Sequence, residues 1–288
     1  MTPASEITAT TAAETVIPTF KTLRIVRPSA HVAQVLLTSD RKGNPFGMEL
    51  WDEIPLAFRA LDADPTVRVI VLATLAPHFT YGLDVASVAP HLMAMAAGGA
   101  SERAAFIAFG QRWQAALGAV AEIRAPVIAA VNGWCIGAGV ELIAACDIRV
   151  CSSDAKFSLR EVKVGIVPDV GGLQRLPFLI GEGPARQLAM TGEDIDATAA
   201  KSYGLVNSVH ADAAAALEAA MVIAEQIAAN APLVVQGIKR VMNTRIQAAV
   251  DASMLHALQV NAALIQTQDF TEVMGAMLQR RTPVFAGK

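Results

Sequence analysis

The stretch PVIAAVNGWCIGAGVELIAACDIRV, residues 126–150, decides how this sequence folds. It has the apolar length of a membrane span, yet turn residues and one acid interrupt it: Pro126, the Asn132-Gly133 pair, Gly137, Gly139 and Glu141. Such a segment suits several short buried elements better than one membrane helix. The elements that we expect are a strand over 126–133, a helix over 138–145 and a strand over 147–152.

One charged residue, Glu141, lies in the apolar run GAGVELIAAC. An ionised carboxylate is costly to bury, so either a partner satisfies it or catalysis uses it. The small residues before it open a helix, whose free N-terminal amides form a positive site able to stabilise an oxyanion. The GxG of this stretch is no dinucleotide fingerprint, because the third glycine of GxGxxG is missing.

Strands and helices alternate along the rest of the chain up to about residue 211. Strand patterns cover 22–28, 32–38, 67–74, 156–159 and 205–210, and helical patterns cover 48–61, 101–121, 171–180 and 183–192. From Asp212 onward only helices are expected, over 212–229, over 232–265 with a break, and over 269–280. The sequence therefore predicts a strand-rich core with interleaved helices and a helical tail.

Composition limits the classes of function. The 288 residues, 53% hydrophobic and 17% charged, supply a large core and suit one domain with a trailing subdomain. A formal net charge of -3 without long Lys/Arg runs argues against nucleic acid as a partner. The three cysteines match no zinc or redox spacing and are expected to be buried thiols in a reducing cytoplasm: Cys135, Cys146 and Cys151. Residues 1–19 lack the features of a secretory signal, so we expect a flexible lead-in.

Two further stretches contain candidate functional residues. In HFTYGLD (78–84), a glycine after a buried strand lets the backbone approach a ligand, although an ordinary turn has the same pattern. REVKVGIVPDVGG (160–172) places Glu161 before an apolar run and Asp169 after it. Each acid is alternatively a solvated loop residue or a helix cap, and Asp169 suits the N-cap of a helix starting near Gly171. No two histidines have metal-ligand spacing and no GxSxG is present, so we expect no metal site.

Taken in order, these stretches resemble the enoyl-CoA hydratase/isomerase (crotonase) superfamily from about residue 20 to the end. The matching pieces are FTYGLD, the 126–150 stretch, EVKVGIVPDVGGLQRLP, AMTGEDIDATAAKSYGLVNSV and TQDFTEVMGAMLQRRTPVF. The resemblance implies an α/β fold, a spiral of ββα units, with an acyl-CoA-binding core over 20–211. It also implies a helical oligomerisation region over 212–288, in a trimer or a dimer of trimers. Coenzyme A would be part of the substrate, with no separate cofactor.

The resemblance also assigns roles to individual residues. The backbone amides of Leu83 and Ala138 match the family's oxyanion hole, although many relatives have glycine where Ala138 stands. Glu141 and Glu161 match the two glutamates of the hydratases, which activate water for attack at C3 and deliver a proton to C2. Asp169 matches instead an aspartate of the dienoyl-CoA isomerases, which typically have aspartate where this chain has Glu141.

Contacts to coenzyme A are expected from residues around these motifs. In the family, the loop after the second strand supplies a basic residue, here Arg41 or Lys42, and Gly82 and Asp84 flank the oxyanion amide. From the C-terminus, Arg280 or Arg281 would reach the ligand of a neighbouring subunit. The stretch 89–106 is expected to shape the acyl pocket, and its Met and Gly content indicates mobility.

The sequence thus favours an enzyme acting on unsaturated fatty acyl-CoA, in fatty acid metabolism. Isomerisation of 3,5-dienoyl-CoA to 2,4-dienoyl-CoA is the first expectation, because it needs a proton removed near C2 and another returned at C6, and Asp169 supplies an extra acid. Hydration of trans-2-enoyl-CoA is the alternative, and a non-catalytic acyl-CoA-binding protein is the second alternative. We expect a cytoplasmic homo-oligomer with neither nucleic acid nor a membrane as partner.

Overall fold

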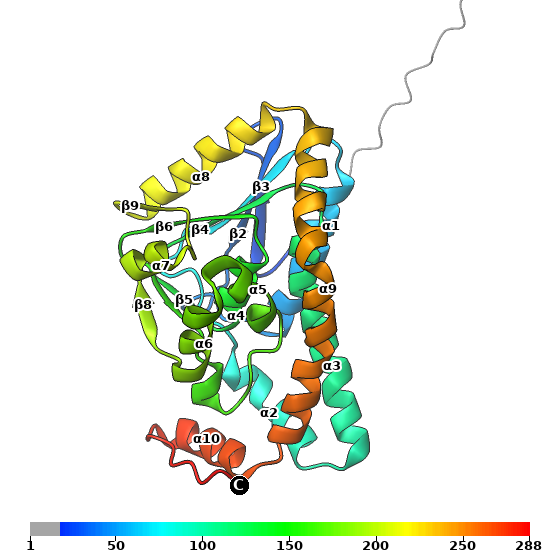
Figure 1. Ribbon diagram of the computed structural model, residues 1–288, viewed down its shortest axis with the longest axis vertical. Helices are drawn as coiled ribbons and strands as arrows, with labels where there is room; N and C mark the ends of the chain where they lie inside the picture. The colour runs from blue at the N-terminus through cyan, green and yellow to red at the C-terminus, as the bar shows by residue number, and fades with distance from the viewer. Residues whose placement is uncertain (1–17) are drawn as a thin grey trace, which may run out of the picture.

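The computed structural model describes residues 18–288 and shows an α/β fold, as predicted (Figure 1). The larger sheet has the strand order β1-β2-β3-β4-β6-β9, in which only β1 is antiparallel to its neighbour. Its strands are β1 (Leu23–Val26), β2 (Val32–Leu37), β3 (Val69–Thr74), β4 (Val127–Val131), β6 (Ile148–Ser152) and β9 (Ser208–His210). The smaller sheet has the order β5-β7-β8, formed by β5 (Trp134–Ile136), β7 (Lys156–Ser158) and β8 (Asp194–Asp196).

Helices cover both faces of the larger sheet and extend beyond it. The helices before β6 are α1 (Met48–Ala63), α2 (Val85–Ala96), α3 (Ala100–Glu122) and α4 (Ala138–Ala144). Those after β7 are the 3-10 helix η1 (Glu161–Val164), α5 (Gly172–Ile180), α6 (Glu182–Thr191), α7 (Ala197–Tyr203), α8 (Ala213–Ala228), α9 (Pro232–Leu264) and α10 (Gln268–Gln279). In Figure 1, α9 runs along α3 at one side of the molecule, and α10 lies beyond its end.

The core has one layer on each face of the larger sheet and a third cluster among α2, α3, α9 and α10. On one face, α8 presents Ala220, Ala224 and Ala228 to the strands, and side chains this small at every fourth position let the helix pack close. On the other face, α1 and α3 bury larger side chains, among them Phe58 and Leu117. All six residues of β3 are buried, which confirms the prediction for 67–74.

Several expectations from the sequence were wrong. The helix over 232–265 has no break, because packing of α9 on α3 and α5 outweighs the roughly 1 kcal/mol that a helix-interior glycine such as Gly237 costs. No helix was expected over 85–96, but α2 forms there, so the stretch 89–106 lies mostly in α2 and the start of α3, and its mobility stays a prediction. The short elements β5, β8 and α7 were missed. The lead-in over 1–19 lies almost wholly outside the described residues, and the domain boundaries stay predictions.

The described helices give little support for a membrane span. No single helix within 18–288 has the length and apolarity to cross a bilayer. Only α8 and α9 taken together satisfy such a criterion, and they meet at a bend of 110°.

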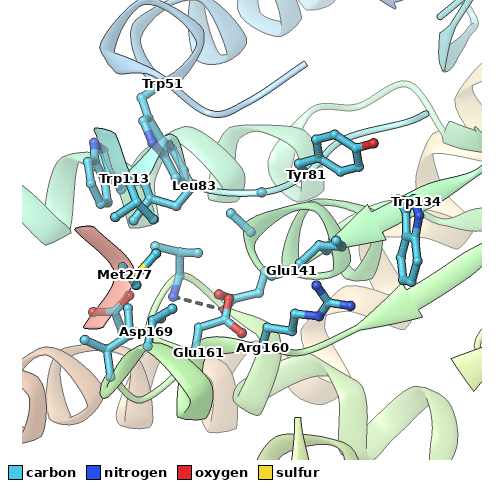
Figure 2. A pocket seen from close by; sticks show the side chains of 18 residues that line it. Trp51, Tyr81, Leu83, Trp113, Trp134, Glu141, Arg160, Glu161, Asp169 and Met277 are labelled. Carbon is cyan, nitrogen blue, oxygen red and sulfur yellow. Dashed lines mark hydrogen bonds between the residues drawn. The ribbon is translucent and has the colours of Figure 1, made fainter. Parts of the chain in front are cut away.

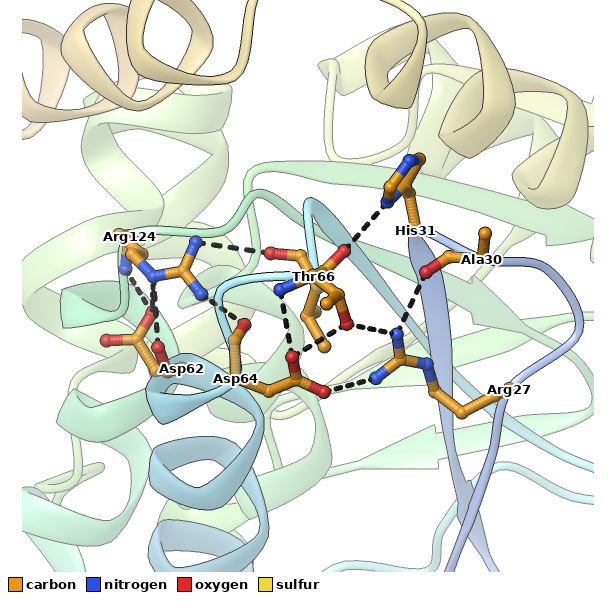
Figure 3. Close-up of polar contacts among 8 residues, drawn as sticks. Arg27, Ala30, His31, Asp62, Asp64, Thr66 and Arg124 are labelled. Atoms are coloured by element: carbon orange, nitrogen blue, oxygen red, sulfur yellow. Dashed lines mark hydrogen bonds and ion pairs between the residues drawn. The ribbon is translucent and has the colours of Figure 1, made fainter. Parts of the chain in front are cut away.

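At the edge of the sheet where β3 begins, charged groups satisfy one another (Figure 3). Arg27 donates to Asp64 at 2.7 Å and to the hydroxyl of Thr66 at 2.8 Å, and the amide and hydroxyl of Thr66 also donate to Asp64. Burial raises the pKa of Asp64, but these hydrogen bonds outweigh it and leave the pKa below its ordinary value. This network holds the α1–β3 loop against the end of β1, so its role is structural.

Candidate active site

The two glycine-containing stretches follow neighbouring parallel strands, β3 and β4, so they meet at the same edge of the sheet. A bridge joins them: the amide of Thr80 donates to Trp134 O at 2.9 Å, and the amide of Ile136 donates to Thr80 O at 3.1 Å. Gly82 has a φ of +77°, and a Cβ there would lie 2.5 Å from Ile136 O. Only glycine allows this approach, and the same Cβ position lies 3.6 Å from the Ala138 nitrogen.

The amides of Leu83 and Ala138 are therefore close together and free. Phe46 pairs with the residues on either side of Leu83: its amide donates to Gly82 O at 2.8 Å, and its carbonyl accepts from the Asp84 amide at 3.1 Å. The Leu83 N–H thus faces away from that pairing. Ala138 opens α4, where the first amides have no partner within the helix. Among residues 18–288, neither amide donates to another group.

Both residues line a cavity of about 530 Å³ (Figure 2). One side of it carries Leu83 and the stacked indoles of Trp51 and Trp113, whose centroids are 4.7 Å apart. The opposite side carries three carboxyl groups. The full lining is Trp51, Tyr81, Gly82, Leu83, Val85, Trp113, Trp134, Ile136, Gly137, Ala138, Glu141, Arg160, Glu161, Val164, Ile166, Asp169, Val170 and Met277. Two oxyanion donors facing three acids in an apolar cavity can stabilise an enolate and move protons beside it.

Glu141 has partners and also faces the cavity. It is 2% exposed, and its Oε2 accepts from the amides of Val170 at 3.1 Å and Gly172 at 2.6 Å, at the start of α5. Burial raises its pKa well above the ordinary value, the charges of Glu161 and Asp169 raise it further, and the two amides oppose this. A methyl group on Gly172 would lie 2.7 Å from the Glu141 side chain, so glycine is needed at this contact.

Glu161, the first residue of η1, is buried beside the oxyanion end of the cavity. A Cβ on Gly137, the residue before Ala138, would lie 2.8 Å from its Oε1. Its Oε2 is buried without a hydrogen-bond partner among residues 18–288. Burial raises the pKa of Glu161 to about 7, and the charge of Asp169 contributes to the rise. A carboxyl group near neutral pKa with one unpartnered oxygen is suited to proton transfer.

Asp169 lies farther along the cavity, toward its apolar end. It also lines an adjoining hollow of about 30 Å³, together with Phe106, Phe109 and Trp113. Burial raises the pKa of Asp169 to about 6, opposed by a hydrogen bond that its Oδ2 accepts from Asn261 at 2.7 Å. The expectation that Asp169 caps α5 was wrong: the N-cap is Gly171, and the amides at that helix start are taken by Glu141.

The residues expected at coenzyme A lie in two groups. Arg41 forms an ion pair with Asp84, which is buried directly after Leu83, and Lys42 is exposed next to it. Arg280 and Arg281 are exposed at the end of α10, and Arg281 is paired with Glu272. Within residues 18–288, no cluster of His, Cys, Asp or Glu is suited to a metal ion. None of these basic residues lines the cavity itself.

Several cavity residues were not expected from the sequence. Arg160 donates to both carboxylate oxygens of Asp194 at 2.7 Å and lies 5.1 Å from the ring centroid of Trp134. Its position next to Glu161 was the only available signal. Asn261 gave none, because α9 is 33 residues long and its contact with Asp169 spans 92 positions.

Comparison with known proteins agrees with this geometry. Residues 27–288 match the profile of the family described as enoyl-CoA hydratase/isomerase. A mitochondrial Delta(3,5)-Delta(2,4)-dienoyl-CoA isomerase of Dictyostelium discoideum is 35% identical over 271 residues, covering 93% of this chain and 92% of the relative. An (E)-benzylidenesuccinyl-CoA hydratase of Thauera aromatica is 32% identical, covering 90% and 97%. A crystal structure of an enoyl-CoA hydratase/isomerase from Pseudoalteromonas atlantica superposes with a TM-score of 0.79 at 27% identity, covering 92% and 100%.

Proposed function

The chain belongs to the enoyl-CoA hydratase/isomerase family, and we propose that it converts 3,5-dienoyl-CoA thioesters to 2,4-dienoyl-CoA thioesters. The observation that carries this proposal is the third carboxyl group: Asp169 faces the cavity instead of capping α5. The isomerase of D. discoideum, to which the chain is 35% identical, supports the same choice.

The first step takes place at the oxyanion end. The thioester oxygen accepts hydrogen bonds from the amides of Leu83 and Ala138, which stabilise the charge that develops when a proton leaves C2. Glu161 is the base for that proton, because it lies beside Gly137 and hence beside the Ala138 amide. Its unpartnered Oε2 is available to accept the proton. The electron pair of the broken C–H bond spreads over the conjugated chain as a trienolate.

The second step takes place at the other end of the conjugated chain. Asp169 gives its proton to C6, which leaves double bonds at C2 and C4 and an ionised carboxylate. Its position toward the apolar end, next to the hollow lined by Phe106 and Phe109, matches an atom several bonds from the thioester. One proton is taken up and one released, so the reaction is balanced without a water molecule.

The alternative function, hydration, differs from isomerisation in the role of Glu141. In a hydratase, Glu141 and Glu161 together would activate water for attack at C3 and protonate C2, and Asp169 would have no step. The hydratase relative from T. aromatica keeps this alternative open. In the isomerisation, Glu141 holds the start of α5, through the amides of Val170 and Gly172, and with it the loop that carries Asp169.

A two-substrate assay of the purified protein tests the proposal. With a 3,5-dienoyl-CoA, we expect the absorbance of the conjugated 2,4-dienoyl thioester to rise. Loss of the enoyl-thioester absorbance from a trans-2-enoyl-CoA, without any dienoyl conversion, would instead identify a hydratase. If both substrates remained unchanged while acyl-CoA binding was measurable, the chain would be a non-catalytic acyl-CoA-binding protein.

We also propose which residues contact coenzyme A and how the chain assembles. Arg41, Lys42, Gly82, Asp84 and the C-terminal pair Arg280–Arg281 would contact coenzyme A. The chain would form a trimer or a dimer of trimers, because α9 exposes large apolar side chains such as Leu233 and Val241, 79% and 72% exposed. Light scattering after size exclusion would give the oligomeric state.

A cytoplasmic location, with neither nucleic acid nor a membrane as partner, remains our expectation, although the D. discoideum isomerase is mitochondrial.

A further inference from the structure

Asn261, on α9, makes an unusual set of contacts with the segment that carries Asp169. It is fully buried. Its Oδ1 accepts from the amide of Val167 at 2.8 Å, and its Nδ2 donates to Val167 O at 2.8 Å and to Asp169 Oδ2 at 2.7 Å. All the hydrogen-bonding capacity of the Nδ2 group is thus used.

These contacts determine which way the amide of Asn261 points. The Val167 N–H can only donate, so it requires an acceptor, and only Oδ1 of Asn261 is one. Nδ2 must then face the carboxyl group of Asp169. The orientation of Asn261 is therefore set by the backbone of the loop, and it presents a donor to one particular oxygen of Asp169.

The donor at Oδ2 restricts which oxygen of Asp169 can carry the proton. A carboxylic acid proton on Oδ2 would point at the N–H that already occupies that position, whereas no side chain among residues 18–288 donates to Oδ1. We propose that Asn261 is a positioning residue that directs the proton of Asp169 to Oδ1, the oxygen left free for the acyl chain. This inference rests on the proposed isomerisation and adds to it the group that orients its acid.

Among residues 18–288, Asn261 is the only side chain that donates to the carboxyl group of Asp169, beside the backbone amide of Asp169 itself. The titratable groups beside it are Glu161 on η1 and Glu141 on α4, two acids whose pKa values the charge of Asp169 raises. From α3, Gln114 holds the same loop, but it donates to the backbone carbonyl of Asp169 at 2.6 Å and to Met254 O. Gln114 and Asn261 thus hold one loop through different atoms, which provides a matched pair of variants.

The test compares Asn261→Leu with Gln114→Leu. Loss of the Asn261 donor removes a hydrogen bond to the charged form, so the pKa of Asp169 should rise by about one unit. Because Glu161, at about 7, sets the limb at high pH, this rise should move the low-pH limb of 3,5-dienoyl-CoA isomerisation upward from about 6 and the high-pH limb much less. At the pH of maximal rate, kcat should fall about tenfold with KM nearly unchanged, because the acid is no longer oriented. Gln114→Leu should lower activity without moving either limb.

A readout that needs no reaction separates this inference from the proposed function. Carbon-13 titration of the Asp169 carboxyl, assigned by its loss in Asp169→Asn, should show the same rise in Asn261→Leu and none in Gln114→Leu, even if the protein isomerises nothing. Thermal unfolding checks that each variant folds, and Asn261→Ala, which removes the amide without adding bulk, carries the same expectation if the leucine variant does not fold. An unchanged pKa of Asp169, or an equal shift in both variants, would overturn the inference.

Discussion

At the Leu83 end of the cavity the working groups are backbone amides, whereas at the Asp169 end they are side chains held by distant helices. The amide end is built by one bridge between the loops after β3 and β4, with glycines where a Cβ would collide. The acid end depends on Asn261 and Gln114, which lie 92 and 55 positions from Asp169. The amides have one function, to bind an oxyanion, whereas a different set of acids at the other end would give a different reaction on the same fold.

The charged network at the start of β3 extends this comparison. There, Asp64 has cationic and hydroxyl partners and its pKa is lowered, in spite of its partial burial. In the cavity, Glu161 and Asp169 are buried near one another, no cation from residues 18–288 bonds to either, and the pKa of each is raised. The same residue types thus stabilise the fold at one edge of the sheet and stay able to exchange protons at the other.

The largest effect is expected from Glu161→Gln. Removing the base at C2 should lower isomerisation about 10²–10⁴-fold, and any hydration as well. Glu161 binds its proton more tightly in the folded state, at a pKa of about 7, than at its ordinary value of 4.5, so its ionisation destabilises the fold as pH rises between these values. The amide variant should therefore unfold at an equal or higher temperature at pH 8. Lower thermal stability together with lost activity would point to misfolding instead.

Disrupting the amide end directly should have the next largest effect. In Gly82→Ala the new methyl group would meet Ile136 O and displace the loop that carries the Leu83 amide. Loss of one oxyanion donor costs about 10²–10³ in kcat. Gly183→Ala is the control, because it lies exposed on α6 with no atom within 4 Å of the added Cβ, and its activity should equal that of the native chain. Near-native kcat in Gly82→Ala would contradict the role of the Leu83 amide.

At the acid end we expect a smaller, graded effect of pH on the rate of isomerisation. Isomerisation needs an ionised Glu161 and a protonated Asp169, the less populated of the two forms with one proton, so the rate should fall when both are ionised and when both are protonated. With pKa values of about 7 and about 6, kcat/KM should be bell-shaped, with its maximum between them and a loss of about tenfold for each pH unit beyond either limb. A rate that is flat from pH 5 to pH 9 would rule out this pair as the proton carriers.

The two ends of the cavity also differ in how far the sequence predicts their residues. The amide end was predictable, because Gly82 and Gly137 are local requirements that a short stretch of sequence displays, as are the buried strands on either side. Glu141 was found because it interrupts an apolar run, and Glu161 because it precedes one and matches the second glutamate of the hydratases. The support of Asp169 was not, because Asn261 lies in an ordinary helical pattern and acts only through tertiary packing. For the same reason the unbroken α9 and the helix α2 were missed.

The most direct test of the account is the isomerisation rate of Asp169→Asn, measured beside any hydration by the same preparation. The substitution keeps the size of the side chain and removes the proton donor at C6. We predict that conversion of a 3,5-dienoyl-CoA falls by at least about a hundredfold, while acyl-CoA binding and much of any hydration remain. Undiminished isomerisation by a folded Asp169→Asn enzyme would contradict the central claim and reduce Asp169 to a residue of the cavity wall.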